Sequence, residues 1–167
     1  METKRTRGDA AHRYLTIEVE HEIYAIPILK VKEILGMKEI TPLPQTPASV
    51  KGVLNLRGRI IPVVDLRVKF GLLSHPPTKT TSIVVLDLVS EKEQLLLGIV
   101  VDTVQEVQVI LEDKISQLAG LETRVKARYI KSVADTPEGI RILLDVDKIL
   151  TEDDLAVLDQ VPEKQLA

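Results

Sequence analysis

The sequence contains no cysteine and no tryptophan, and it has only four aromatic residues: Tyr14, Tyr24, Phe70 and Tyr129. Without cysteine the chain has no disulfide, no thiolate metal ligand and no cysteine nucleophile. Four aromatic side chains and a net charge of −3 offer little for base stacking or phosphate binding, so we expect no nucleic-acid binding. Hydrophobic residues still make up 44% of the chain. The interior must therefore consist of Val, Ile and Leu, which favour β-strands.

Long apolar runs are also absent. No stretch approaches the roughly 20 apolar residues that a membrane-spanning helix needs. Residues 1–13 are polar and charged, without the apolar core of a signal peptide. We therefore expect a cytoplasmic protein with no direct membrane insertion and disordered tails at residues 1–13 and 161–167.

The residues that support catalysis are few and scattered. His12 lies in the N-terminal tail, His21 in a predicted turn and His75 in a predicted linker. The sequence has no nucleophile triad, no HExxH motif and no glycine-rich phosphate loop. We therefore predict no enzyme activity, no catalytic residues, no metal site and no cofactor.

The most informative stretch is Val50–Leu66, in which two apolar runs meet at Asn55-Leu56-Arg57-Gly58. Gly58 can take a positive φ without steric cost, so the stretch predicts a hairpin. Pro62 lacks a backbone donor, which places the second strand at an edge or a bulge. Asp65 then predicts the N-cap of a short helix over Leu66–Phe70.

The other segments also predict mostly short strands. We expect a strand–turn–strand unit from Tyr14 to Ile28 with its turn at His21-Glu22. Apolar spacing predicts a helix over Ile28–Leu35, and Asp102 is placed to cap a helical turn over Thr103–Val107. Further strands are expected at Ser82–Val89, Gln94–Val101, Tyr129–Ala134 and Gly139–Asp145, and a C-terminal helix at 152–160.

This order of elements repeats on either side of a proline-rich linker, Leu72–Thr81. Tyr24–Leu35 aligns with Leu97–Gln108 at an offset of 73, and Val50–Leu66 aligns with Ile130–Val146 at an offset of 80, with seven identities in 29 positions. The repeat predicts an internal duplication. The fold class is therefore expected to be mainly β, with two small five-stranded barrels at about 14–73 and 82–146 and a few short helices.

The alignment makes Val31 equivalent to Val104 and Glu33 equivalent to Glu106. In one interpretation the valines are core residues, the glutamates are solvated and Arg57 stays in water at a hairpin tip. In the other, Arg57 and the valines anchor a partner on the surface. The residues alone leave both interpretations open.

The hairpin GVLNLRGRIIPVVDLR (Gly52–Arg67) resembles the signature of the CheW family of bacterial chemotaxis coupling proteins. Ile28–Ile34 and Gly98–Val107 resemble the same family in order and spacing, and the resemblance covers about Arg13–Gln160. It implies one CheW-like domain at 14–160, built from two SH3-like five-stranded barrels that are a pseudo-duplicated pair. It also implies a non-enzymatic adaptor located at receptor arrays on the inner face of the membrane.

The resemblance further implies two protein partners. A groove between the subdomains would take the cytoplasmic tip of a methyl-accepting chemotaxis receptor, lined or bordered by Val31, Glu33, Arg57, Val104 and Val107. The regulatory domain of the histidine kinase CheA would bind the first barrel around four positions, Leu43, Val50, Lys51 and Gly52.

Two other functions compete with this one. The chain could be a CheW-like scaffold of another signalling array, which the sequence does not separate from chemotaxis. A different class would be a double barrel that binds a small ligand in the groove between its halves. A buried pocket with converging acids or histidines would favour that class, whereas a shallow apolar groove would not.

Overall fold

Short runs rich in Val, Ile and Leu form strands throughout the chain, because alternate side chains can be buried on a sheet. The computed structural model describes residues 12–89, 94–116 and 129–149. Its strands are β1 (Arg13–Val19), β2 (Glu22–Pro27), β3 (Val31–Gly36), β4 (Val50–Leu56), β5 (Arg59–Asp65), β6 (Ser82–Val89), β7 (Gln94–Val101), β8 (Thr103–Val109), β9 (Ile115–Ser116), β10 (Ile130–Thr136) and β11 (Gly139–Leu144). The helical elements are α2 (Leu66–Lys69) and the 3₁₀ turns η2 (Ile28–Lys30), η3 (Glu112–Lys114) and η5 (Val146–Lys148).

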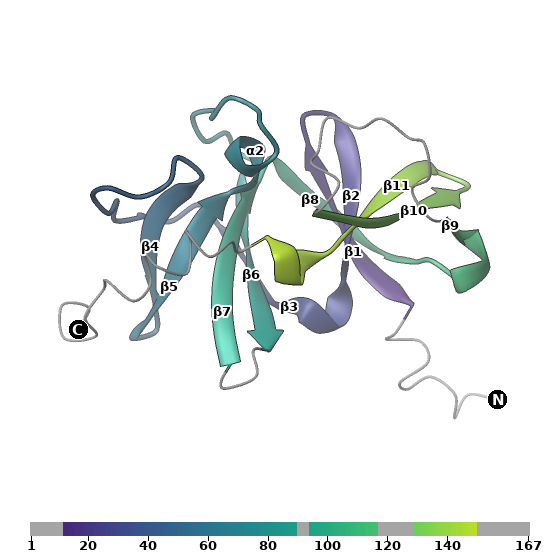
Figure 1. The fold of residues 1–167 in the computed structure, drawn as a ribbon, viewed down its shortest axis with the longest axis horizontal. Helices are drawn as coiled ribbons and strands as arrows, with labels where there is room; N and C mark the ends of the chain where they lie inside the picture. Colours follow the sequence, from purple (N-terminus) through teal and green to yellow (C-terminus); the bar gives the residue numbers. More distant parts are fainter. Residues whose placement is uncertain (1–11, 90–93, 117–128, 150–167) are drawn as a thin grey trace.

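The strands form two sheets that lie side by side (Figure 1). One has six strands in the order β8-β1-β2-β11-β10-β9, and the other has five in the order β3-β6-β7-β5-β4. Within residues 12–149, as far as the structure describes them, the chain crosses between the sheets twice, from β2 through η2 to β3 and from β7 to β8. Each crossover therefore ends in a strand at the edge of the opposite sheet.

The two sheets repeat one pairing pattern. In each, a hairpin (β1–β2 or β6–β7) is flanked by an antiparallel crossing strand (β8 or β3) and a parallel strand from the second hairpin (β11 or β5). The register repeats too: Val50↔Val64 corresponds to Ile130↔Leu144 at the offset of 80. Likewise Val63↔Gly98 in one sheet corresponds to Leu143↔Ala25 in the other. The common origin of the two halves stays a prediction.

One hydrophobic core, here called the shared core, lies between the sheets. It takes alternate residues from both, among them Ile17, Ile26, Val84, Ile99 and Leu144. A second set, here called the far-face cluster, covers the opposite face of the five-stranded sheet and consists of Leu54, Leu56, Ile61, Val63, Ile83, Val85, Leu96 and Val100. Because β5, β6 and β7 contribute to both sets, they are buried on two faces.

The predicted division into two closed five-stranded barrels at 14–73 and 82–146 is not what the structure has. The end strands of each sheet, β8 and β9 or β3 and β4, do not pair with each other among the described residues. The six-stranded sheet combines β1 and β2 with β8–β11, and the five-stranded sheet takes β3–β7. Each crossing strand thus belongs to the sheet opposite to the hairpin that precedes it: β3 follows β2 but lies in the five-stranded sheet, and β8 follows β7 but lies in the six-stranded sheet. Cutting the sequence into two consecutive halves cannot reproduce this pairing.

The two helical predictions that preceded the hairpins were wrong. Val31–Gly36 and Thr103–Val109 are strands, and only Ile28–Lys30 has a single 3₁₀ turn. An extended conformation lets β3 pair with β6 and β8 with β1, which outweighs the local apolar spacing. The helix at Asp65 is confirmed, because its carboxylate accepts a hydrogen bond from the Arg67 backbone N–H. The predicted 152–160 helix and terminal tails, apart from residues 12 and 13, lie outside the described residues.

Candidate protein-interaction site

The tip of the β4–β5 hairpin is a two-residue turn. Arg57 and Gly58 both have positive φ, 51° and 84°, as a type I′ turn requires. The Asn55 side-chain oxygen accepts a hydrogen bond from the Gly58 N–H at 2.9 Å. The hairpin therefore presents Arg57 from a defined backbone conformation.

Arg57 forms a bidentate ion pair with Glu33 of β3. Its Nη1 and Nη2 donate to Glu33 Oε1 and Oε2 at 2.6 and 3.0 Å. The Arg57 side chain is nonetheless 73% exposed. These hydrogen bonds from Arg57 hold the pKa of Glu33 below its usual value. The Arg57 guanidinium is thus held on the surface in a fixed orientation beside the end strand β3.

The apolar members of the predicted receptor face lie on the two crossing strands. Val31 of β3 and Val104 of β8 are half-buried and pack against the shared core. Val107 of β8 is 51% exposed. The interpretation of Val31 and Val104 as core residues is therefore partly right, whereas Glu33 is not a merely solvated acid. The structure brings Glu33 and Arg57 into direct contact.

The four residues predicted for the kinase contact are placed differently from one another. Leu43 is half-buried against the shared core, and Lys51 Nζ lies 3.9 Å from Asp65 Oδ2. Val50 is buried within the shared core. Gly52 is also buried with φ 143°, and an added Cβ would lie 2.0 Å from the carbonyl oxygen of Thr41. Val50 and Gly52 therefore shape the strand and present no side chain to a partner.

One polar cluster was missed by sequence analysis. Arg67 in α2 donates to Asp102 Oδ2 at 2.6 Å and also to Glu20 Oε2. Asp102 was expected to cap a helical turn, but it accepts from Arg67 and from the Glu20 N–H instead. The sequence did contain one signal. In the alignment at the offset of 73, Asp102 is equivalent to the apolar Leu29, so the two copies differ at this position.

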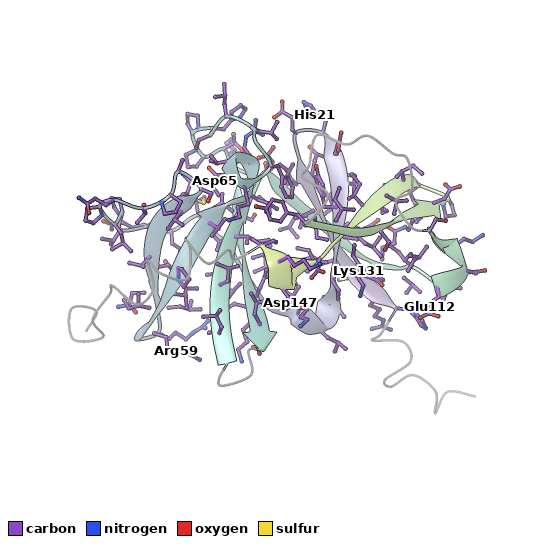
Figure 2. The ribbon with its side chains drawn as sticks, viewed as in Figure 1. His21, Arg59, Asp65, Glu112, Lys131 and Asp147 are labelled. Atoms are coloured by element: carbon purple, nitrogen blue, oxygen red, sulfur yellow. The ribbon has the colours of Figure 1, made fainter. Side chains whose placement is uncertain are left out.

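The features expected of an active site do not converge in the part of the chain that the structure describes. Within it, no group of three or more His, Cys, Asp or Glu residues could hold a metal ion. A cavity of about 350 Å³ lies beside β1, β9, β10 and β11, but its lining includes one histidine, His12, and one acid, Glu112. Figure 2 shows Glu112 and Lys131, another lining residue, at the six-stranded sheet.

No helix among the described residues is long and apolar enough to cross a membrane. The described residues define a β protein of two packed sheets, with an ordered ion pair on its surface. The CheW-like domain family model matches residues 13–154, and the chain belongs to this family.

Individual proteins agree with this assignment. The chain is 34% identical over 148 residues to a chemotaxis protein CheW of Klebsiella aerogenes, covering 89% of this chain and 87% of that one. It is 29% identical over 155 residues to a chemotaxis protein CheW of Treponema pallidum, with 90% and 89% of the two chains covered. The crystal structure of the scaffolding protein TtCheW from Thermoanaerobacter tengcongensis is similar with a TM-score of 0.77 and 26% identity, covering 86% of this chain and 95% of that one.

Proposed function

We propose that this protein is a non-enzymatic adaptor that couples methyl-accepting chemotaxis receptors to the histidine kinase CheA. The observation that carries the proposal is the exposed, oriented Arg57–Glu33 pair within a chain of the CheW-like family. Such a protein would act in the cytoplasm at receptor arrays. Its work would be to hold two partners in a fixed geometry rather than to transform a substrate.

The receptor would bind where the crossing strands and the hairpin tip meet solvent. Val107 offers exposed apolar surface on β8, and Val31 and Val104 would border the contact from their half-buried positions. Arg57 and Glu33 would supply the polar contacts that fix the register of a receptor helix. A helical tip bound by a few apolar anchors and oriented polar groups fits the helix-in-groove mode of recognition.

The kinase would bind along the β4 side of the five-stranded sheet. β4 is an end strand, and the loop before it contributes the half-buried Leu43. Lys51 is partly exposed on the same strand, whereas Val50 and Gly52 would act by shaping the backbone. Because this side is formed by the body of β4, whereas the receptor side is formed by β3, β8 and the tip of the hairpin, both partners could be held together. A receptor state could then bias the kinase through their shared scaffold.

The proposal is tested by binding each partner separately. Arg57→Ala is expected to reduce capture of the protein by a receptor cytoplasmic fragment at least about tenfold, consistent with loss of an anchor worth ~1.4 kcal/mol or more. Capture by the CheA regulatory domain is expected to stay at the wild-type level. Arg59→Ala is the matched control, since Arg59 directly follows the turn, is exposed and has no ion pair among the described residues.

The arms of this experiment separate the competing functions. If Arg57→Ala loses the kinase and keeps the receptor, the assignment of the two surfaces is wrong. If the wild-type protein captures neither partner, another signalling array or a small-ligand function replaces the proposal. Val107→Asp should weaken receptor capture without lowering the melting temperature, because this valine is already half in solvent.

A further inference from the structure

A cluster of charged side chains around the buried Arg67 joins the two sheets on one side of their junction. Arg67 follows β5 of the five-stranded sheet, and its side chain is 6% exposed. Its Nη2 donates to Glu20, in the β1–β2 turn of the six-stranded sheet. Its Nη1 donates to Asp102, where the chain crosses from β7 to β8. One guanidinium thus contacts the five-stranded sheet, the six-stranded sheet and a crossover between them.

Both ends of this cluster are held by further hydrogen bonds. Asp102 donates its N–H to Glu18 O at 3.1 Å and accepts at its carboxylate from the Glu20 N–H at 2.9 Å. Its carbonyl oxygen accepts from Thr80 Oγ1 at 3.0 Å. On the other side, Arg67 Nε donates to Leu73 O at 2.9 Å. Neither the arginine nor the crossover can shift without breaking several of these bonds.

The equivalent place on the opposite side has a more exposed ion pair, although Val146 and Ile149 there are buried in the shared core. The offset of 80 matches Arg67 with Asp147 of η5, and Asp147 pairs with Lys30 of η2 at 3.3 Å. The Lys30 side chain is 31% exposed and the Asp147 side chain is 52% exposed. Exposed ion pairs contribute little to stability. Figure 2 shows Asp65, beside α2, and Asp147 on opposite sides of the junction. The first crossover also leaves Leu29 exposed where the second has Asp102.

We propose that the hydrogen-bonded charges of Arg67, Asp102 and Glu20 form a fastener that fixes the angle between the two sheets, and that the exposed pair of Lys30 and Asp147 does not fix it. β8 begins directly after Asp102, and β3 begins directly after Lys30. The relative position of the two crossing strands therefore depends on the fastener. The inference concerns the isolated chain and does not rest on the proposed partners.

The test measures the distance between the sheets by pulsed electron spin resonance. Spin labels are placed on cysteines introduced at Arg59 in β5 and Lys131 in β10, which are exposed and are both labelled in Figure 2. The chain has no cysteine of its own to remove. Arg67→Met breaks the fastener while keeping similar volume, and Lys30→Met breaks the exposed pair as the matched control.

The expected result is a single narrow distance distribution in the wild type and in Lys30→Met, and its loss in Arg67→Met. If Arg67→Met folds and keeps the narrow distribution, the proposal is overturned. Equal broadening in Lys30→Met overturns it as well, since the fastener would then have no special part. If Arg67→Met does not fold, Arg67→Lys takes its place. This variant keeps the charge but loses the two-pronged guanidinium contact, so it should broaden the distribution, and an unchanged distribution would refute the role of the fastener.

Discussion

The two sheets share strand pairing and register but fill their far faces with different side chains. In the five-stranded sheet the far-face cluster is entirely aliphatic. At the offset of 80, three of its members correspond to smaller or polar residues in the six-stranded sheet: Leu54 to Ala134, Leu56 to Thr136 and Ile61 to Arg141. All three replacements are buried. The same backbone arrangement thus has an aliphatic far face in one sheet, whereas the other combines buried polar residues with a smaller apolar cluster of Ala25, Ile110, Ala134 and Leu143.

Hydrogen bonds supplement this smaller apolar cluster in the six-stranded sheet. Thr136 Oγ1 donates to Gly139 O at 2.7 Å, and Arg141 Nε donates to Gln108 Oε1 at 3.0 Å. Gln108 in turn donates to Glu138 Oε2 at 3.0 Å. Because Gln108 lies in β8, these bonds attach an end strand to the β10–β11 hairpin. A buried polar group is tolerated there because it is bonded.

The largest expected loss of stability comes from shortening a side chain of the far-face cluster to the residue that the six-stranded sheet has at the equivalent position. Leu54→Ala introduces the residue that the six-stranded sheet has at Ala134, and it should lower the free energy of unfolding by about 2–5 kcal/mol through lost burial and a cavity. Urea denaturation measures the change. The reverse substitution, Ala134→Leu, should cost about 1–3 kcal/mol by overpacking. A loss below about 1 kcal/mol for Leu54→Ala would mean that the far-face cluster collapses around the cavity.

A smaller effect is expected when the polar network is broken. Arg141→Met should lower the free energy of unfolding by about 1–3 kcal/mol, because it leaves the half-buried Gln108 oxygen without its donor. The double variant Arg141→Ile with Gln108→Leu carries the residues found at Ile61 and Leu35 in the five-stranded sheet. It should be less destabilised than the sum of its single substitutions, because both members of the Arg141–Gln108 hydrogen bond are removed and Glu138, which loses its donor, is exposed to water. Simple additivity in denaturation would show that the two side chains do not act together.

Much of this comparison was accessible from the sequence. The strands β6 and β7 and the hairpin β4–β5 could be predicted because each is a dense run of Val, Ile and Leu bounded by turn residues. The alignment offsets also predicted that the two sheets share a strand register. Adding the offset of 80 to a residue pair of the β4–β5 hairpin gives a residue pair of the β10–β11 hairpin. Local pattern and internal similarity therefore predicted the elements and their equivalence.

The exchange of crossing strands could not be predicted in this way. Ile28, Val31, Ile34 and Leu35 have helical spacing, yet Ile34 points to solvent in β3 because pairing with β6 decides the conformation. The partners of Arg67 are 47 and 35 residues away in sequence, so no local pattern joins them. The Glu33–Arg57 pair was in the predicted set only through the family resemblance; their direct contact, across 24 residues, came from the structure.

The two aspartates that end the second strand of each hairpin offer a sharper comparison. Asp65 is buried, caps α2 and accepts from Ser74 Oγ at 2.9 Å, whereas the equivalent Asp145 makes no side-chain cap hydrogen bond. Asp65→Ala should therefore cost about 1–2 kcal/mol, as loss of an N-cap does. Asp145→Ala should cost clearly less in the same thermal and urea unfolding measurements. Equal losses would imply that both acids act through the general charge of the region.

The smallest effect separates the equivalent glutamates Glu33 and Glu106. Arg57 lowers the pKa of Glu33 in the folded state through its hydrogen bonds, so the ionised form is favoured on folding. The resulting stability should be fully present above the unfolded pKa and should be lost as the pH falls through the lower, folded pKa. Glu33→Gln should thus be less stable than the wild type at pH 7, with the difference shrinking in acid.

Glu106→Gln is the reference for this measurement, because Glu106 is exposed and has no ion pair among the described residues. The difference in free energy of unfolding between Glu106→Gln and the wild type should stay constant as the pH is lowered from 7. Since Arg57 is largely in solvent, the Glu33 effect should also weaken at high salt, which exposed pairs show and buried ones do not. If Glu33→Gln and Glu106→Gln gave the same pH dependence, the ion pair would not be populated in solution. The asymmetry between the two crossing strands would then be a matter of apolar surface alone.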